Sequence, residues 1–319
     1  MLNTILEQLY KYAKIDKRIV FIGTDNAPGM LNEMKESLPN QFFMEGASEQ
    51  NIIGMASGMA ADGLIPYVFN HATFNTRRVY EQVLVDCALQ NRHIRIIGIG
   101  GGVATCHLGP THTSIEDIGL MRLIPRMTVL SASDKKQLTE IFPQTINYPG
   151  SIYIRIGKYG LPNLDSACKA EIKLPQIYTG NTDKVYEKIL VLSHGAIFRR
   201  VYESVQRLNN EYENRFILLN IHTIKPLNNK YLKPLLESAL GVMIIEEHIL
   251  TGGLSSAIGE LLISKNVSLK NVKSISLGND NYIHNFGKQE EIWDKHYLSV
   301  QSIYEAGSKL IQDGQKENL

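Results

Sequence analysis

The chain has 319 residues, enough for two domains of ordinary size, and its formal net charge is +1 because 33 Lys and Arg nearly balance 32 Asp and Glu. This balance, without any long basic run, excludes the charge pattern of a nucleic-acid-binding protein, and no apolar run reaches the length of a membrane span. The cysteines Cys87, Cys106 and Cys168 form no C-x-x-C pair, so we expect free thiols and a soluble, cytoplasmic protein.

In the first half of the chain, short β-branched runs alternate with helical patterns, which is typical of parallel α/β sheets. Residues 1–18 predict an amphipathic helix and lack the layout of a signal peptide. A long helix is predicted at residues 73–92. The predicted strands lie at residues 19–23, 42–45, 65–70, 94–100, 127–132 and 151–156.

The alternation stops at residues 161–184, where Gly, Pro, Asn and Asp predict a linker. It resumes afterwards, with predicted strands at residues 188–196, 216–224, 241–247 and 271–278. We therefore expect an α/β protein with domains at 1–160 and 185–319, each a mostly parallel sheet flanked by helices.

Two glycine-rich segments resemble nucleotide-binding loops but do not match them. The glycines of "IIGIGGGVATCHLG", residues 96–109, do not give G-x-G-x-x-G, and a loop follows them instead of a helix. The segment "GGLSSAIGELL", residues 252–262, precedes a helix and favours close strand-to-helix packing. Neither segment predicts a dinucleotide site.

Glu49 stands where a short apolar strand is followed by a predicted helix. Gly46 breaks the strand, Ser48 is in position to cap the helix, and apolar residues recur from Ile52 at helical spacing. A Glu in the first helical turn is either an acid favoured by the helix dipole or a functional acid at the carboxyl end of a strand, where open α/β sheets bind ligands.

Three histidines lie near the ends of successive predicted strands. His71, His107 and His112 are surrounded by aromatic and glycine residues, which is consistent with the rim of one site. Their spacing matches no zinc motif, so no metal ligands are predicted in this chain.

Residues 43–160 resemble the pyrimidine-binding domain of the transketolase family of thiamine-diphosphate enzymes. The resemblance rests on "GASEQNIIGMASGMAADGLIPYVFNHATF", "YEQVLVDCALQ", "GPTHTSIEDIGLMRLIPRMTVLSASD" and "GSIYIRIGKYG", in the family's order. Residues 185–319 resemble the family's C-terminal domain through "IHTIKPL", "IIEEHILTGGLSSAIGE" and "SVQSIYEA". The resemblance therefore covers nearly the whole chain.

The family's diphosphate-binding motif, G-D-G, does not occur in this sequence. The resemblance thus implies the second subunit of a split transketolase, with a separate N-terminal subunit that carries G-D-G and holds Mg²⁺ or Ca²⁺. An α₂β₂ heterotetramer built on a homodimer of this chain is expected. The implied reaction transfers a two-carbon ketol unit between sugar phosphates, with no nucleic-acid or membrane partner.

The resemblance also assigns cofactor contacts. The family's glutamate at the position of Glu49 hydrogen-bonds N1′ of the aminopyrimidine and favours the imino tautomer, and burial beneath the cofactor is expected to raise its pKa. Phe74 matches the aromatic residue that stacks on the pyrimidine; the alternative is a core side chain. Arg77, on the same predicted helix face, and Tyr80, one turn further, are further candidates, although Arg77 also suits a solvated charge.

On the substrate side, His112 of "GPTH" matches the histidine that contacts the donor, and His71 is a weaker candidate. Arg155 matches an arginine that grips the sugar phosphate, and Lys158 is placed to assist. Leu108 stands where transketolases carry an acid that contacts a donor hydroxyl, so the ordinary sugar donor is in question.

Two other interpretations stay open. The chain could belong to an enzyme that decarboxylates a 2-oxo acid, similar to 1-deoxy-xylulose-5-phosphate synthase or the β subunit of pyruvate dehydrogenase. It could also be a non-catalytic scaffold subunit, which the retained Glu49 argues against.

Overall fold

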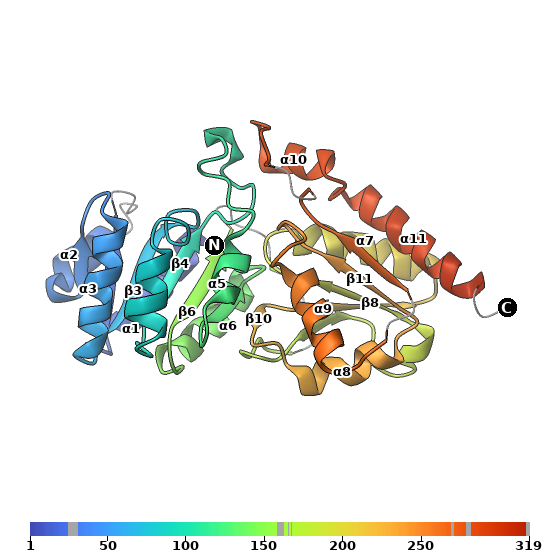
Figure 1. Cartoon of the computed structure of the whole chain (residues 1–319), viewed down its shortest axis with the longest axis horizontal. Coiled ribbons are helices and arrows are strands. Elements are labelled where there is room, and N and C mark those ends of the chain that lie inside the picture. Colours follow the sequence, from blue (N-terminus) through green and yellow to red (C-terminus); the bar gives the residue numbers. More distant parts are fainter. Residues whose placement is uncertain are drawn as a thin grey trace.

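The computed structural model describes residues 1–24, 31–157, 163–164, 166, 168–268, 271–278 and 282–316. The chain forms two α/β units, each built on one sheet with helices on both faces (Figure 1). This confirms the predicted fold class.

The sheet of the first unit has seven strands in the order β10-β5-β6-β4-β3-β1-β2. Adjacent strands in this sheet are parallel, except that β10 pairs antiparallel with β5. Strand β10 comes from the second half of the chain. The strands are β1 (Ile19–Gly23), β2 (Phe42–Met44), β3 (Ile65–His71), β4 (Arg95–Ile99), β5 (Thr128–Ser131), β6 (Ile152–Ile156) and β10 (Thr223–Lys225).

Apolar side chains from helices fill both faces of this sheet. One face is covered by α1 (Leu2–Ala13), α2 (Asn32–Ser37) and α6 (Lys135–Ile146), with η2 (Pro39–Gln41) leading into β2. The other face is covered by α3 (Glu49–Ala61), the helical run α4 (Tyr80–Gln82) and η3 (Val83–Ala88), and α5 (Asp117–Leu123). Because both faces are buried, the central strands read as continuous apolar runs.

The second unit has a five-stranded sheet in the order β12-β11-β8-β9-β7, parallel except for the edge strand β7. Its strands are β7 (Gln176–Thr179), β8 (Ile189–Ser193), β9 (Phe216–Asn220), β11 (Gly241–Ile245) and β12 (Val272–Ile275). One face packs against α7 (Phe198–Glu211), α10 (Gln289–Lys295) and α11 (Val300–Lys316), and the other against α8 (Asn229–Ser238) and α9 (Leu254–Ser264), while η5 (Val185–Glu187) precedes β8.

The predicted linker at 161–184 contains strand β7, so its second half belongs to the sheet. The register pairs Ile177 with Leu219, and Gln176 accepts a 2.8 Å hydrogen bond from the side chain of Gln137 on α6. This strand has only four residues and lies between Pro175 and Gly180, so its sequence pattern is too short to be distinguished from that of a loop.

The helix predicted at 73–92 begins late. Residues 72–79 form turns, in which Asn75 donates to the Ile97 carbonyl and Thr76 to the Ala72 carbonyl. Such side-chain bonds compete with the helical backbone ladder. The α-helical turn of α4 starts only at Tyr80 and continues as a π-helical turn in η3.

None of the described helices combines the length and the apolar character that crossing a membrane requires.

Candidate active site

The carboxyl ends of three strands in the first sheet bring the predicted site residues together. Glu49 opens α3 after β2, His71 ends β3, Phe74 lies in the turn that follows, and His112 lies in the loop after β4. Because neighbouring parallel strands end at the same edge, these side chains share the edge where open α/β sheets bind ligands.

Glu49 is buried, with 6% of its side chain exposed. Its Oε1 accepts hydrogen bonds from Asn70 Nδ2 at 3.1 Å and from Arg78 Nη1 at 2.9 Å. The hydroxyl of Ser48 donates to the Glu45 carbonyl and does not cap α3, contrary to the prediction. Glu49 is thus a buried carboxylate held by side chains from β3 and the following turn.

Burial alone acts to raise the pKa of Glu49, as expected. Hydrogen bonds from its own backbone amide, from Arg78 and from Asn70 outweigh burial and hold the pKa below its ordinary value. The lowering of the pKa comes first from the hydrogen bond of its own backbone amide, then from Arg78, which the sequence pattern does not single out, and from the buried amide of Asn70. The rise in pKa expected for Glu49 beneath a bound cofactor stays a prediction.

Three rings gather beside this carboxylate. The His112 ring lies 5.2 Å from Phe74 and 5.7 Å from His71, and His71 lies 5.9 Å from Phe74, all measured between centroids and all edge-on. The guanidinium of Arg78 lies 4.2 Å from the centroid of Phe74. The cluster of Glu49, His71, Phe74, Arg78 and His112, here called the carboxylate–aromatic cluster, offers a proton-holding group beside a flat apolar surface.

Arg77 lies outside this cluster, contrary to the expected shared helix face with Phe74. Its guanidinium pairs with Glu116, and its Nη2 donates to the Thr113 carbonyl at 2.7 Å. The turn at residues 72–79 directs consecutive arginines differently: Arg77 holds the "GPTH" loop while Arg78 reaches Glu49. Tyr80 is half-buried against the apolar core under α3.

Leu108 lies in η4 (Cys106–Leu108), in the segment that rises beside α10 in Figure 1, and 47% of it is exposed. The thiol of Cys106 donates to the Gly287 carbonyl, which joins this segment to the second unit. His107 is exposed in the same turn. Lys158 falls outside the described residues.

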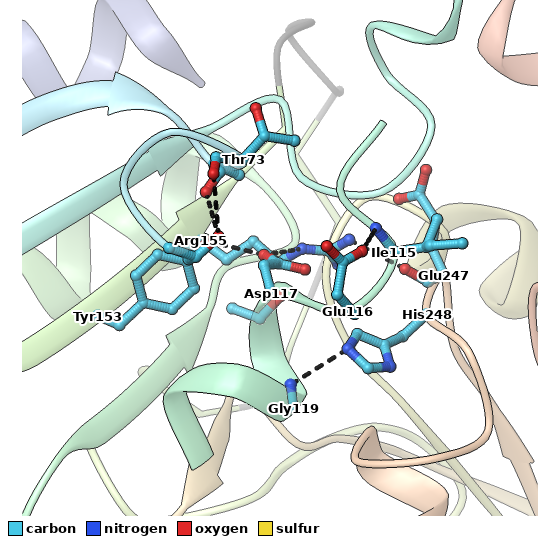
Figure 2. Close-up of polar contacts among 12 residues, drawn as sticks. Thr73, Ile115, Glu116, Asp117, Gly119, Tyr153, Arg155, Glu247 and His248 are labelled. Atoms are coloured by element: carbon cyan, nitrogen blue, oxygen red, sulfur yellow. Dashed lines mark hydrogen bonds and ion pairs between the residues drawn. The ribbon is translucent and has the colours of Figure 1, made fainter. Parts of the chain in front are cut away.

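Arg155 has a different place from the one predicted. Only 3% of its side chain is exposed, and its Nε lies 3.0 Å from Oδ2 of the fully buried Asp117 (Figure 2). Its Nη2 donates to the Glu247 carbonyl at 2.9 Å. This guanidinium is buried, paired with the Asp117 carboxylate and bonded to the main chain of Glu247, so in this structure it faces the protein interior and not a surface site. This geometry argues against the phosphate-binding role, which stays a prediction.

This buried network joins the two units. Glu247 follows β11 of the second unit, and its Oε1 accepts from the Val103 amide and from Gln289. The Gly119 amide at the start of α5 donates to His248 Nε2 at 3.2 Å, as Figure 2 shows. Burial raises the pKa of Glu247.

The same network explains Gly101 and Gly102. A Cβ on Gly101 would collide with the side chain of Arg155, and a Cβ on Gly102 would collide with the carboxyl group of Glu247. These glycines let the backbone approach buried charged side chains.

Among the described residues, no group of three or more His, Cys, Asp or Glu side chains is placed to hold a metal ion. The carboxylate–aromatic cluster suits a flat heteroaromatic ring that carries hydrogen-bond donors.

Two family models match the chain. Residues 1–162 match the pyrimidine binding domain of transketolase, and residues 179–301 match the transketolase C-terminal domain. Among curated proteins, the chain is 28% identical to one subunit of the apulose-4-phosphate transketolase of Phocaeicola vulgatus over 97% of each chain. It is 30% identical to the 6-deoxy-6-sulfo-D-fructose transketolase subunit SqwH of Clostridium sp. strain MSTE9, covering 82% of this chain and 80% of that protein.

A solved structure described as a split gene transketolase, an inactive beta4 tetramer, has the same fold. The two structures superpose with a TM-score of 0.83 over 97% of each chain at 22% sequence identity.

Proposed function

Since the chain belongs to the transketolase family, we propose that it is the C-terminal subunit of a split transketolase that depends on thiamine diphosphate and transfers a two-carbon ketol unit. The observation that carries the proposal is the full-length match to a protein named as one subunit of a transketolase. The carboxylate–aromatic cluster, at the sheet edge where the resemblance places the aminopyrimidine, supports it.

The residues present fit half of the cofactor. Phe74 offers a ring face for the aminopyrimidine, and Glu49 is a buried carboxylate for N1′. The sequence has no G-D-G motif for the diphosphate and its metal. We therefore propose that a partner subunit supplies that motif with Mg²⁺ or Ca²⁺, in an α₂β₂ assembly.

Thiamine diphosphate supplies the electron sink for cleaving the bond next to a carbonyl. The chain's own residues provide orientation and proton control. Phe74 fixes the plane of the aminopyrimidine, and Glu49 holds or releases the proton at N1′. His112, 5.7 Å from His71 between ring centroids, is proposed to hydrogen-bond the donor's hydroxyl or carbonyl oxygen.

The donor is proposed to be a ketose, as in the relatives. One observation favours a second candidate, a 2-oxo acid that loses carbon dioxide. Leu108 cannot accept the hydrogen bond of the family's acid, and Arg155 is closed off by Asp117. Both features remove contacts specific to an ordinary sugar-phosphate donor.

The test is reconstitution. The chain is titrated with thiamine diphosphate and Mg²⁺ by calorimetry, alone and with a G-D-G-bearing N-terminal transketolase subunit of the same organism. Tight binding and ketol transfer from xylulose 5-phosphate or another ketose are expected only with both subunits. Carbon dioxide release from pyruvate without ketol transfer would support the second candidate, and tight binding to this chain alone would contradict the split site.

A further inference from the structure

Arg78 contacts both groups that the proposed function assigns to the aminopyrimidine. Its Nη1 lies 2.9 Å from Oε1 of Glu49, and its guanidinium carbon lies 4.2 Å from the ring centroid of Phe74. One planar group thus lies between the carboxylate and the aromatic face.

The guanidinium and the aminopyrimidine share the relevant chemistry. Both are flat and both stack on an aromatic ring. The guanidinium donates its N–H groups to a carboxylate, and the ring nitrogen N1′ shares a proton with one. The guanidinium of Arg78 lies over the Phe74 ring while it pairs with Glu49, so it covers one face of that ring. A ring that stacks on Phe74 and hydrogen-bonds Glu49 would have to occupy the space of this guanidinium.

The side chain of Arg78 can also move away from Glu49 and Phe74 into solvent. Half of its side chain is exposed, whereas only 6% of Glu49 is exposed. A long side chain at the surface can rotate into solvent without opening the core. The buried amide of Asn70 stays on Glu49 when it does so, donating at 3.1 Å.

We infer that Arg78 is a placeholder that occupies the aminopyrimidine position until the cofactor displaces it. The inference rests on the proposed function. Its consequence is a competition: the ion pair with Glu49 and the stacking on Phe74 must be given up before the cofactor binds. Glu49 can share a proton with N1′ only after Arg78 has left it. The ion pair with Arg78 and the hydrogen bond to the cofactor are therefore mutually exclusive.

The experiment compares Arg78→Ala with Arg199→Ala, which removes an equally charged exposed side chain from its pair with Glu203 on α7. In the complex with the partner subunit and Mg²⁺, the Kd of thiamine diphosphate is measured by calorimetry. An exposed ion pair and a cation–π contact together predict about fivefold to twentyfold tighter binding for Arg78→Ala, with Arg199→Ala unchanged. Equal or weaker binding by Arg78→Ala would overturn the inference while the proposed function stands.

A second measurement is independent of turnover and of the partner. The carboxyl ¹³C resonance of Glu49 is titrated in the full chain alone. Its pKa is expected to rise in Arg78→Ala and to stay unchanged in Arg199→Ala, because only the first variant loses the cation beside Glu49. An unchanged pKa in Arg78→Ala would overturn the placeholder. If the wild-type complex does not bind thiamine diphosphate at all, the proposed function fails and the inference fails with it.

Discussion

Replacing Asp117 by Asn tests how much the buried network stabilises the protein. Asp117 is fully buried, its Oδ2 accepts a 2.7 Å hydrogen bond from the Tyr153 hydroxyl, and the same oxygen lies 3.0 Å from Arg155 Nε. Asparagine keeps the shape and one acceptor but removes the charge. Arg155 then stays buried with the Glu247 side of the network as its remaining partner.

The magnitude follows from the burial of both partners. Removing one member of a buried ion pair costs about 3–5 kcal/mol, because it leaves an uncompensated charge out of water. At about 2–4 °C per kcal/mol for a domain of this size, the Tm should fall by about 6–20 °C.

Thermal unfolding followed by circular dichroism measures the effect. The matched control is Asp294→Asn, which breaks the ion pair between Asp294 and Arg200. The Asp294 side chain is 58% exposed, so this change should lower the free energy of unfolding by about 1 kcal/mol or less. The double change Asp117→Leu with Arg155→Met should recover part of the loss, since it removes both buried charges. A Tm for Asp117→Asn within the range of Asp294→Asn would refute the reasoning.

Three further outcomes are expected. Glu49→Gln should lower ketol transfer by the assembled enzyme by about 10²–10⁴ with unchanged circular dichroism, because the amide cannot exchange the N1′ proton. Gly102→Ala should destabilise the fold by about 2–5 kcal/mol in chemical unfolding, because its φ is +76° and its Cβ would meet the Glu247 carboxyl. Burial lowers the pKa of His222 to about 4, so His222 takes up a proton in the unfolded chain at a higher pH than in the folded protein. The free energy of unfolding should therefore fall by about 3 kcal/mol as the pH drops from about 6.5 to 4. His222→Gln should make the free energy of unfolding less dependent on pH in this range.

Each of these three expectations would be contradicted by a different result. Near-normal turnover in Glu49→Gln would leave Glu49 as a helix-end acid. The control for Gly102 is Gly259→Ala in α9, where an added Cβ meets nothing within 4 Å. This change should raise the free energy of unfolding by about 0.5–1 kcal/mol, because alanine favours the helix. Equal effects of the two changes would refute the close-packing argument. An unaltered pH profile of Tm in His222→Gln would show that His222 does not titrate between the folded and unfolded states.

The sheets and the strand ends can be predicted from sequence because they depend on local patterns. The β-branched runs predict the main strands, and the break at Gly46 places Glu49 at a strand-to-helix junction, where the structure has it. The gathering of His71, Phe74 and His112 at one edge likewise agrees with parallel topology, since His71 ends β3, Phe74 lies just after it, and His112 lies in the loop that follows β4. Their assigned roles stay predictions.

The errors arise where long-range contacts decide the outcome. The helix expected from Thr73 is replaced by turns because Asn75 bonds to the carbonyl of Ile97 on another strand. The structure pairs Arg155 with the buried Asp117, a contact that its sequence position does not reveal and that argues against the expected phosphate role. Arg78 follows Arg77 directly, and only the turn geometry separates an arginine that holds a loop from one that reaches Glu49.

The crossing of strand β10 into the first sheet has a consequence for synthesis on the ribosome. β5 pairs with β6 on one side and with β10 on the other, and β10 ends at Lys225, far beyond the last residue of β6. Roughly 70 residues separate these points, which takes about 3–14 s of translation at 5–20 residues per second. During that interval one edge of β5 has no strand beside it, and an open edge of this kind is a template for pairing with another chain. The nascent first domain therefore passes through a stage at which it is exposed to misassembly, and the stage closes only when the second domain is already being made.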